Sequence, residues 1–264
     1  MTILQNILDV KKNEVKELHQ KYSRASFTDF EMFAADRLDF NAALRKKRKI
    51  NVIAEIKQAS PSKGIINNNF DHMKIAENYF RAGADAISVL TDKVFFKGDI
   101  SYLKEIAEIK TVPLLRKDFI IDEFQILEAK AHGADAILLI TEALSKEQIK
   151  DFTAIAKEND LDVLLEIHSA DQIEKIDFIN NRIIGINNRN LDNFQVDIKK
   201  TKELAKLFNE EMTVVSESGI SSKGDLDFLK TTNTRAVLVG EHFMKSYNIE
   251  ESLSEFIEWC QLAN

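Results

Sequence analysis

The chain has 264 residues, of which 44% are hydrophobic, and it carries a formal net charge of −7 at pH 7. A chain of this length without a break in composition can bury one large core, so we expect a single domain over residues 1–264. The negative field repels phosphate-rich polymers, which argues against nucleic acid or an anionic membrane as partner. A small anionic substrate remains compatible with this charge if cations gather locally.

The first 48 residues are predicted to form a helical extension that precedes the main fold. Ile3, Leu4, Ile7 and Leu8 alternate with charged residues as in an amphipathic helix, and not as in the continuous apolar stretch of a signal peptide. The extension ends in a basic run over residues 45–49, which we interpret as a solvated cationic cap at a helix end.

From residue 49 to residue 264, strand-like apolar runs alternate with helix-compatible segments. The eight runs begin near Asn51, Ala86, Pro113, Ala136, Asp162, Ile183, Thr213 and Ala236. Typical helices between them are expected over residues 70–82, 122–132 and 145–158. This alternation predicts an α/β protein, a (β/α)8 TIM barrel with an N-terminal helical extension.

A short repeat supports the barrel, because Gly-Ala-Asp-Ala-Ile occurs at residues 83–87 and again at residues 133–137. Each copy is expected to close a helix and open a strand. Glycine at a helix C-terminus followed by an apolar strand is ordinary loop chemistry, so we give the repeat a structural role alone.

Polar side chains follow the predicted strands, where a buried strand has no local reason to end in charge. Side chains alternate faces along a strand, and barrel layers are filled by alternate strands, so these groups should converge at the C-terminal mouth. The candidate catalytic residues are Glu55, Lys57, Lys117, Glu166, Asn187 and Glu217. Two lysines among three carboxylates can stay protonated although partly desolvated, and can serve as general acids. Ion pairs that merely close the barrel top are the structural alternative for any one of them.

A phosphate site is predicted on neighbouring loops after the seventh, eighth and first strands. Barrels often bind phosphate on the loops after strands seven and eight, where backbone N–H groups are available. The candidates for phosphate binding are Ser60, Gly219, Gly240 and Glu241, with Ser218 as a further substrate contact. A carboxylate facing a phosphate dianion is unfavourable, so we expect Glu241 to use only its backbone N–H.

An apolar slot for an aromatic ring is predicted from Pro61, Phe96, Phe119 and Leu191, which follow strand ends. No metal site is expected, because the five histidines lack paired ligand spacing. His168 lies near the predicted mouth, and we interpret it as an outward or loop residue. Dinucleotide, Walker and nucleophile-elbow motifs do not occur in the sequence. Cys260, the only cysteine, cannot form a disulfide within the chain, and we expect a cytoplasmic protein.

At these residues the chain resembles the indole-3-glycerol phosphate synthase family of tryptophan biosynthesis, over nearly its whole length. The segments that carry the resemblance are residues 53–57, 60–64, 87–91, 115–120, 165–168, 185–189 and 217–220. The resemblance implies a TIM-barrel carboxy-lyase without metal or organic cofactor. It would convert an anionic phosphosugar, 1-(2-carboxyphenylamino)-1-deoxyribulose 5-phosphate, to indole-3-glycerol phosphate, CO2 and water.

The resemblance also implies a role for each matching residue. Lys117 looks like the general acid, Lys57 like the group that holds the substrate carboxylate and assists loss of the hydroxyl, and Glu166 like a proton acceptor. The remaining residues would orient hydroxyls and lysines (Glu55, Asn187, Glu217), pair with the carboxylate (Arg189) or bind phosphate (Ser60, Gly219, Gly240). The chain departs from the family pattern at Asn190, often aspartate, and at Glu241, serine in some members.

Two other functions stay open at this point. Phosphoribosylanthranilate isomerase shares phosphate loops but needs a cysteine and aspartate pair, whereas Cys260 lies in the last predicted helix. A non-catalytic barrel would be expected to lack the lysines. As for partners, we expect a small-molecule substrate, no nucleic acid, no membrane, and a monomer or weak homo-oligomer.

Overall fold

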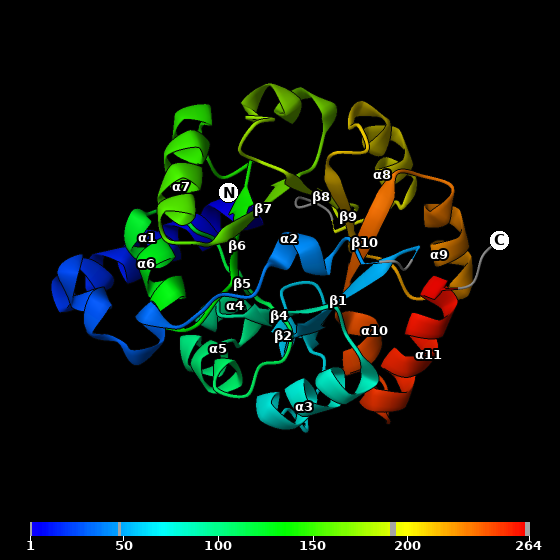
Figure 1. The fold of residues 1–264 in the computed structure, drawn as a ribbon, viewed down its shortest axis with the longest axis horizontal. Helices are drawn as coiled ribbons and strands as arrows, with labels where there is room; N and C mark the ends of the chain where they lie inside the picture. Colours follow the sequence, from blue (N-terminus) through cyan, green and yellow to red (C-terminus); the bar gives the residue numbers. More distant parts are fainter. Residues whose placement is uncertain (1, 47–48, 191–193, 262–264) are drawn as a thin grey trace.

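The computed structural model describes residues 2–46, 49–190 and 194–261. Within these ranges, eight parallel strands form a closed barrel, in which neighbours along the chain are neighbours in the ring and β10 pairs with β1 (Figure 1). The strands are β1 (Asn51–Ile56), β4 (Ala86–Leu90), β5 (Leu114–Lys117), β6 (Ala136–Ile140), β7 (Asp162–Ile167), β8 (Ile183–Asn187), β9 (Thr213–Glu217) and β10 (Thr234–Val239). The predicted barrel and the order of its strands are confirmed.

Helices surround the barrel in Figure 1, and the N-terminal extension is helical as predicted. The α-helices are α1 (Ile3–Lys21), α2 (Phe40–Ala43), α3 (His72–Ala82), α4 (Lys93–Phe96), α5 (Ile100–Ala107), α6 (Glu123–Ala131), α7 (Lys146–Glu158), α8 (Lys199–Leu204), α9 (Lys223–Lys230), α10 (Glu241–Met244) and α11 (Ile249–Gln261). The 3-10 helices are η1 (Ala25–Asp29), η2 (Glu31–Ala34), η3 (Ala170–Lys175) and η4 (Ala205–Leu207). Helix α3 begins later than predicted because Asp71 caps it by accepting the Lys74 N–H.

The barrel interior is filled by apolar side chains below the mouth, and α2 closes the opposite end. Phe40 and Leu44, both fully buried, pack into the same cluster as Ile53, Leu115 and Leu164 from three strands. The Asn41 N–H donates to Asp162 at the start of β7, which places α2 at the N-terminal ends of the strands. The strands are therefore packed internally, and only their C-terminal ends are available for a site.

The Gly-Ala-Asp repeat has the predicted loop geometry and an additional role for its aspartates. Gly83 and Gly133 have φ values of +85° and +82°, the left-handed region that glycine adopts without strain. The buried carboxylate of Asp85 accepts the Val52 N–H at 3.0 Å, and that of Asp135 accepts the Leu114 N–H at 2.8 Å. Each aspartate therefore binds the first residues of a neighbouring strand, a function that the repeat alone did not indicate.

The described residues of the basic run are exposed to solvent, as we expected, and two of them also contact the barrel. The Arg45 guanidinium donates to the backbone carbonyls of Glu210 and Glu211, each at 3.0 Å. Lys46 lies 3.4 Å from an Asp85 carboxylate oxygen, whereas residues 47 and 48 lie outside the described part of the chain. These exposed cations therefore also bind backbone and carboxylate oxygens on the barrel.

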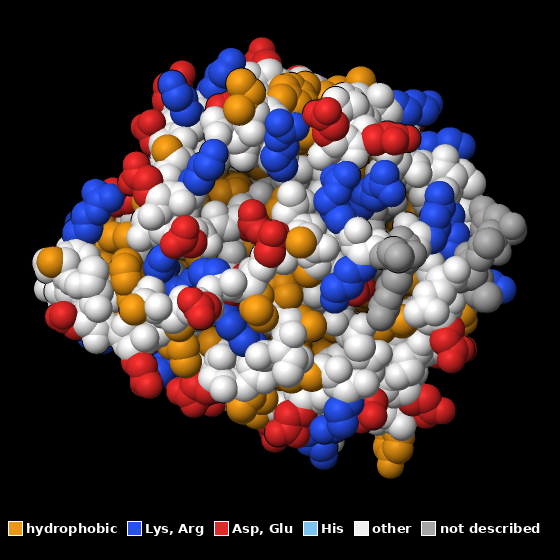
Figure 2. Space-filling model, in the orientation of Figure 1, with side chains coloured by type: hydrophobic (Ala, Val, Ile, Leu, Met, Phe, Trp, Pro, Cys, Tyr) orange, Lys and Arg blue, Asp and Glu red, His pale blue; other side chains and the backbone are white. Residues whose placement is uncertain are grey.

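The surface carries both signs of charge. On the face viewed in Figure 2, Lys and Arg side chains are interspersed with Asp and Glu side chains. Among the described residues, none of the helices combines the length and the apolar character needed to cross a bilayer.

Candidate active site

The mouth of the barrel holds a cavity of about 550 Å³, lined from the C-terminal ends of the strands and the loops that follow them. The predicted site residues that line it are Glu55, Lys57, Ser60, Pro61, Phe96, Lys117, Phe119, Glu166, Asn187, Arg189, Glu217, Ser218, Gly219, Gly240 and Glu241. Leu191, the remaining candidate, lies outside the described residues. The barrel register explains the convergence, since Asn187 lies opposite Glu217 and Glu166 lies opposite Gly185 on adjacent strands.

Lys117 ends β5 and lies between two carboxylates. Its Nζ is 3.4 Å from Glu166 Oε2 and 3.8 Å from Glu217 Oε2, and its side chain is only 17% exposed. Burial would lower the pKa of Lys117, but Glu166, Glu217 and Glu55 outweigh burial and raise that pKa above its ordinary value. The site therefore holds an ammonium group, a proton donor, in a largely desolvated cavity.

The two carboxylates beside Lys117 differ in their affinity for a proton. Burial would raise the pKa of Glu166, but Lys117, His168 and the Asn187 amide favour the anion, and the net pKa is lowered. The pKa of Glu217 is raised well above its ordinary value, first by burial and then by the negative charge of Glu166. Two neighbouring carboxyl groups with opposite shifts are the arrangement expected where one is a base and the other carries a proton.

Two glycines make room for the site carboxylates. A Cβ atom on Gly185 would lie 2.1 Å from Glu217 Oε1, and one on Gly240 would lie 2.5 Å from Glu55 Oε1. Glu55 Oε1 in turn accepts a short hydrogen bond from Lys57 Nζ, and both side chains line the cavity as strand parity predicted. Gly240, for which we predicted a contact with phosphate, provides the space in which Glu55 lies.

An apolar wall borders one part of the cavity. The rings of Phe96 and Phe119 have centroids 6.2 Å apart, and Pro61 lines the same cavity. Sequence reasoning missed the contribution of α1, whose apolar residues Ile3, Leu4 and Ile7 also line it. Their amphipathic spacing indicated a helix that packs on something, but the sequence did not identify the pocket as that surface.

Backbone turns and cations border another part of the cavity. Ser218 and Gly219 both adopt positive φ, +69° and +75°, directly after β9. The loop after β1 forms an unpredicted antiparallel hairpin, β2 (Ala59–Ser60) with β3 (Gly64–Ile65), which brings Ser60 and Lys63 to the cavity. Glu241 Oε1 accepts from Lys245 Nζ at 2.6 Å, and its Oε2 lies 3.8 Å from Arg189 Nη2, so its carboxylate is engaged by cations.

His168 follows β7 as a loop residue, which was one of our two interpretations, but its side chain does not point outward. Its side chain is 7% exposed, and its Nε2 lies 3.3 Å from Glu166 Oε1. The physical reason is strand parity, because His168 follows Glu166 by two positions and so lies on the same side of the chain. Applying the same rule that paired Glu55 with Lys57 would have found it.

The mouth of this TIM barrel combines a desolvated ammonium group with carboxylates whose pKa shifts are opposite in direction. An apolar wall (Pro61, Phe96, Phe119) and a cationic rim (Lys63, Arg189, Lys245) border the same cavity. These features define a general acid/base enzyme for a small anionic substrate. A family model described as "Indole-3-glycerol phosphate synthase" matches residues 4–256. The chain belongs to the indole-3-glycerol phosphate synthase family, the lyases of tryptophan biosynthesis, and it has this activity.

Curated relatives agree with the family match. The chain is 48% identical to the indole-3-glycerol phosphate synthase of Acetivibrio thermocellus, over 83% of this chain and 84% of the relative. It is 45% identical to that of Caldanaerobacter subterraneus, over 97% and 98% of the two chains. The crystal structure of 3-hexulose-6-phosphate synthase from Salmonella typhimurium superposes with a TM-score of 0.66 at 13% identity, covering 80% of this chain and 98% of that one. That likeness concerns the barrel fold alone.

Proposed function

We propose that this cavity closes the pyrrole ring of 1-(2-carboxyphenylamino)-1-deoxyribulose 5-phosphate, with Lys117 as the general acid. The observation that carries the assignment is the Lys117 ammonium group, 3.4 Å from Glu166 and 3.8 Å from Glu217, at the strand ends between an apolar wall and a cationic rim. The substrate has the matching parts: an aromatic ring, a reacting carbonyl and a phosphate.

The two borders of the cavity support one direction of substrate binding. The aromatic ring lies against Phe96 and Phe119, and the phosphate lies on the loops after β9, β10 and β1. Ser60, Gly219 and Gly240 contact the phosphate there, with the Glu241 N–H. The cationic groups of Lys57 and Arg189, which line the cavity, bind the carboxylate on the ring. In this pose the carbonyl carbon lies in the middle of the cavity, beside Lys117.

In the first step the ring carbon that bears the carboxylate attacks the carbonyl carbon. A carbon–carbon bond forms, and the carbonyl oxygen gains a proton from the Lys117 ammonium group. The attack leaves positive charge on the anilino ring, which the Glu166 anion stabilises electrostatically. Loss of CO2 then returns an electron pair to the ring and restores its aromaticity.

In the second step the new hydroxyl group leaves as water. Lys57 supplies the proton to the departing oxygen, and Glu166 accepts the proton lost from the adjacent carbon, which completes the indole double bond. Glu55 holds Lys57 in place through its hydrogen bond, while Asn187 and Glu217, whose pKa is raised by burial, orient the hydroxyl groups and Lys117. Residues on opposite sides of the cavity therefore act as acid and base in turn.

The experiment that tests this assignment is Lys117→Met, assayed by the appearance of indole fluorescence in single turnovers. We expect the chemical rate to fall by about 10² to 10⁴, the usual contribution of a positioned general acid, with an unchanged circular dichroism spectrum. Lys110→Met is the matched control, since Lys110 is a largely buried lysine that pairs with Asp135 instead. Near-normal turnover by the folded Lys117→Met variant would reject the assignment.

We infer a cytoplasmic protein that acts as a monomer or weak homo-oligomer, with no nucleic acid or membrane partner. The single cysteine and the mixed surface charge support this inference. Sedimentation equilibrium of the purified chain tests the oligomeric state, and a tight oligomer at low micromolar concentration would contradict it.

A further inference from the structure

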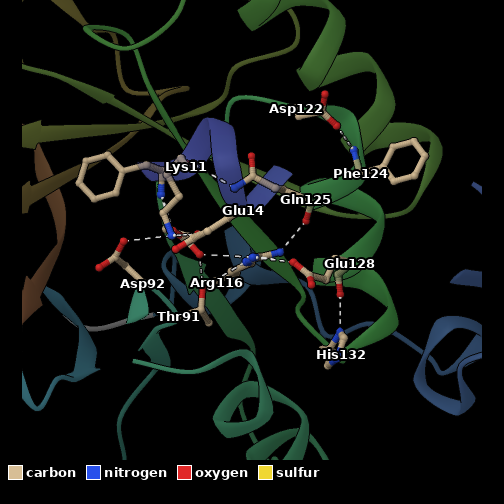
Figure 3. A network of polar contacts seen from close by, with 12 residues as sticks. Lys11, Glu14, Thr91, Asp92, Arg116, Asp122, Phe124, Gln125, Glu128 and His132 are labelled. Atoms are coloured by element: carbon tan, nitrogen blue, oxygen red, sulfur yellow. Dashed lines mark hydrogen bonds and ion pairs between the residues drawn. The ribbon is translucent and has the colours of Figure 1, made fainter. Parts of the chain in front are cut away.

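The N-terminal helix places a lysine in the interior of the molecule. Lys11, near the middle of α1, is 1% exposed, and its Nζ lies 2.8 Å from Asp118 Oδ1, 3.0 Å from Asp92 Oδ2 and 2.7 Å from Glu14 Oε2. Figure 3 shows its side chain directed towards Asp92 and Glu14. Burial would lower the pKa of Lys11, but the carboxylates of Asp118 and Asp92 outweigh burial, so the group stays charged.

Both buried aspartates also hold the backbone of the apolar wall. Asp118 Oδ1 accepts the N–H of Phe119 at 2.8 Å. Asp92 caps α4, and its Oδ1 accepts the N–H groups of Phe95 and Phe96 at 2.7 and 3.1 Å. The Phe96 ring at the end of α4 and the Phe119 ring after β5 therefore stand on segments whose anchoring carboxylates, Asp92 and Asp118, share one ammonium group.

We propose that Lys11 is a positioning residue, which fixes the distance between Phe96 and Phe119 by bridging Asp92 to Asp118, and so sets the fit of the substrate's aromatic ring. Lys11 touches no reacting atom. The inference rests on the proposed function in one respect, because that function assigns the aromatic ring to this wall.

Helix docking alone does not account for this lysine. Helix α1 already has apolar contacts: Leu18, and Tyr22 just after the helix, lie against a cluster formed by Phe27 of η1 with Phe124 and Leu127 of α6. Burying an ammonium group is an expensive way to add to such docking, because desolvation consumes most of the attraction between the charges. What the bridge adds is a defined geometry between two loops that belong to different βα units.

The test is Lys11→Met, with steady-state kinetics on the full-length chain and the phosphosugar substrate. Because a misplaced aromatic contact weakens binding by about tenfold, we expect KM to rise by about that factor while kcat falls by less than about threefold. Lys110→Met is the matched control, which removes a buried lysine from Asp135 at the opposite end of the barrel and should leave KM unchanged.

A second variant keeps the inference testable if Lys11→Met does not fold. Asp92→Asn retains an oxygen that can cap α4 but loses the charge that attracts Lys11, and KM should rise for it too. In a double-mutant cycle, Phe96→Ala combined with Lys11→Met should raise KM by less than the product of the single effects, because both act through the same wall.

The outcomes separate the two claims. If the wild-type chain makes no indole product, the proposed function fails before Lys11 is tested. If the wild type is active and folded Lys11→Met or Asp92→Asn binds substrate with unchanged KM, or if the cycle is strictly multiplicative, the positioning role is wrong.

Discussion

Asp118 links the stability of the barrel to pH through the same buried network. Burial alone would raise its pKa, but Lys11 and Arg116 outweigh burial and lower the pKa from 3.8 to about 2. Since a tenfold change in proton affinity corresponds to about 1.4 kcal/mol, the ionised carboxylate contributes about 2 kcal/mol to the free energy of unfolding. Asp118→Asn, which keeps the shape of the side chain, should lose at least this amount near neutral pH.

The sign of the pH dependence follows from the lowered pKa. A carboxylate that is more acidic in the folded state stabilises the protein above its unfolded pKa and loses that contribution as pH falls through the folded pKa. The pH-dependent part of the stability gap between wild type and Asp118→Asn should therefore be full above about pH 5 and about half as large near pH 3.

Urea denaturation followed by tryptophan fluorescence and circular dichroism, at several values of pH, measures this gap. Asp9→Asn is the control, because Asp9 is an exposed residue of α1 whose ion pair with Lys12 should contribute nothing measurable. A gap that stays constant from neutral to acid pH, or an Asp118→Asn variant as stable as the wild type, would refute the reasoning.

Two further predictions concern the site. Gly185→Ala places a Cβ atom 2.1 Å from Glu217 Oε1, so the carboxyl group must shift. In a kinetic assay, kcat of this variant should fall by about 10-fold to 100-fold. The control is Gly224→Ala, whose new Cβ atom would lie 3.7 Å from its nearest neighbour and should leave kcat unchanged. Because the folded-state pKa of Glu217 is raised, wild type loses stability as pH rises above the unfolded value, and Glu217→Gln does not. The melting temperature of Glu217→Gln, measured relative to that of wild type, should therefore rise from acid to neutral pH. A difference in melting temperature that does not change with pH would contradict the raised pKa of Glu217.

The barrel and the polar residues of its mouth were predictable because both depend on local rules. Apolar runs fix the strands, and side chains at strand ends must converge once the ring closes, so Lys117 and Glu166 could be brought together from sequence alone. The relative proton affinities of these side chains could not be predicted from the sequence, because they depend on distances between strands.

The contacts of α1 were beyond sequence reasoning for a different reason. Lys11 in an amphipathic helix is typical of a solvent-facing position, and its partners lie far away in the chain at Asp92 and Asp118. The hairpin of β2 and β3 escaped prediction because its strands have two residues each, too few for a hydrophobic period.

In the part of the chain that the structure describes, α2 closes the N-terminal end of the barrel, and the cavity lies at the C-terminal end. Below the cavity the axis is filled by buried side chains, including Phe40, Leu44 and Ile53, so nothing can pass through the barrel. Carbon dioxide and water must depart by the route through which the sugar phosphate arrived, and the bicyclic product must clear that route before another turnover begins.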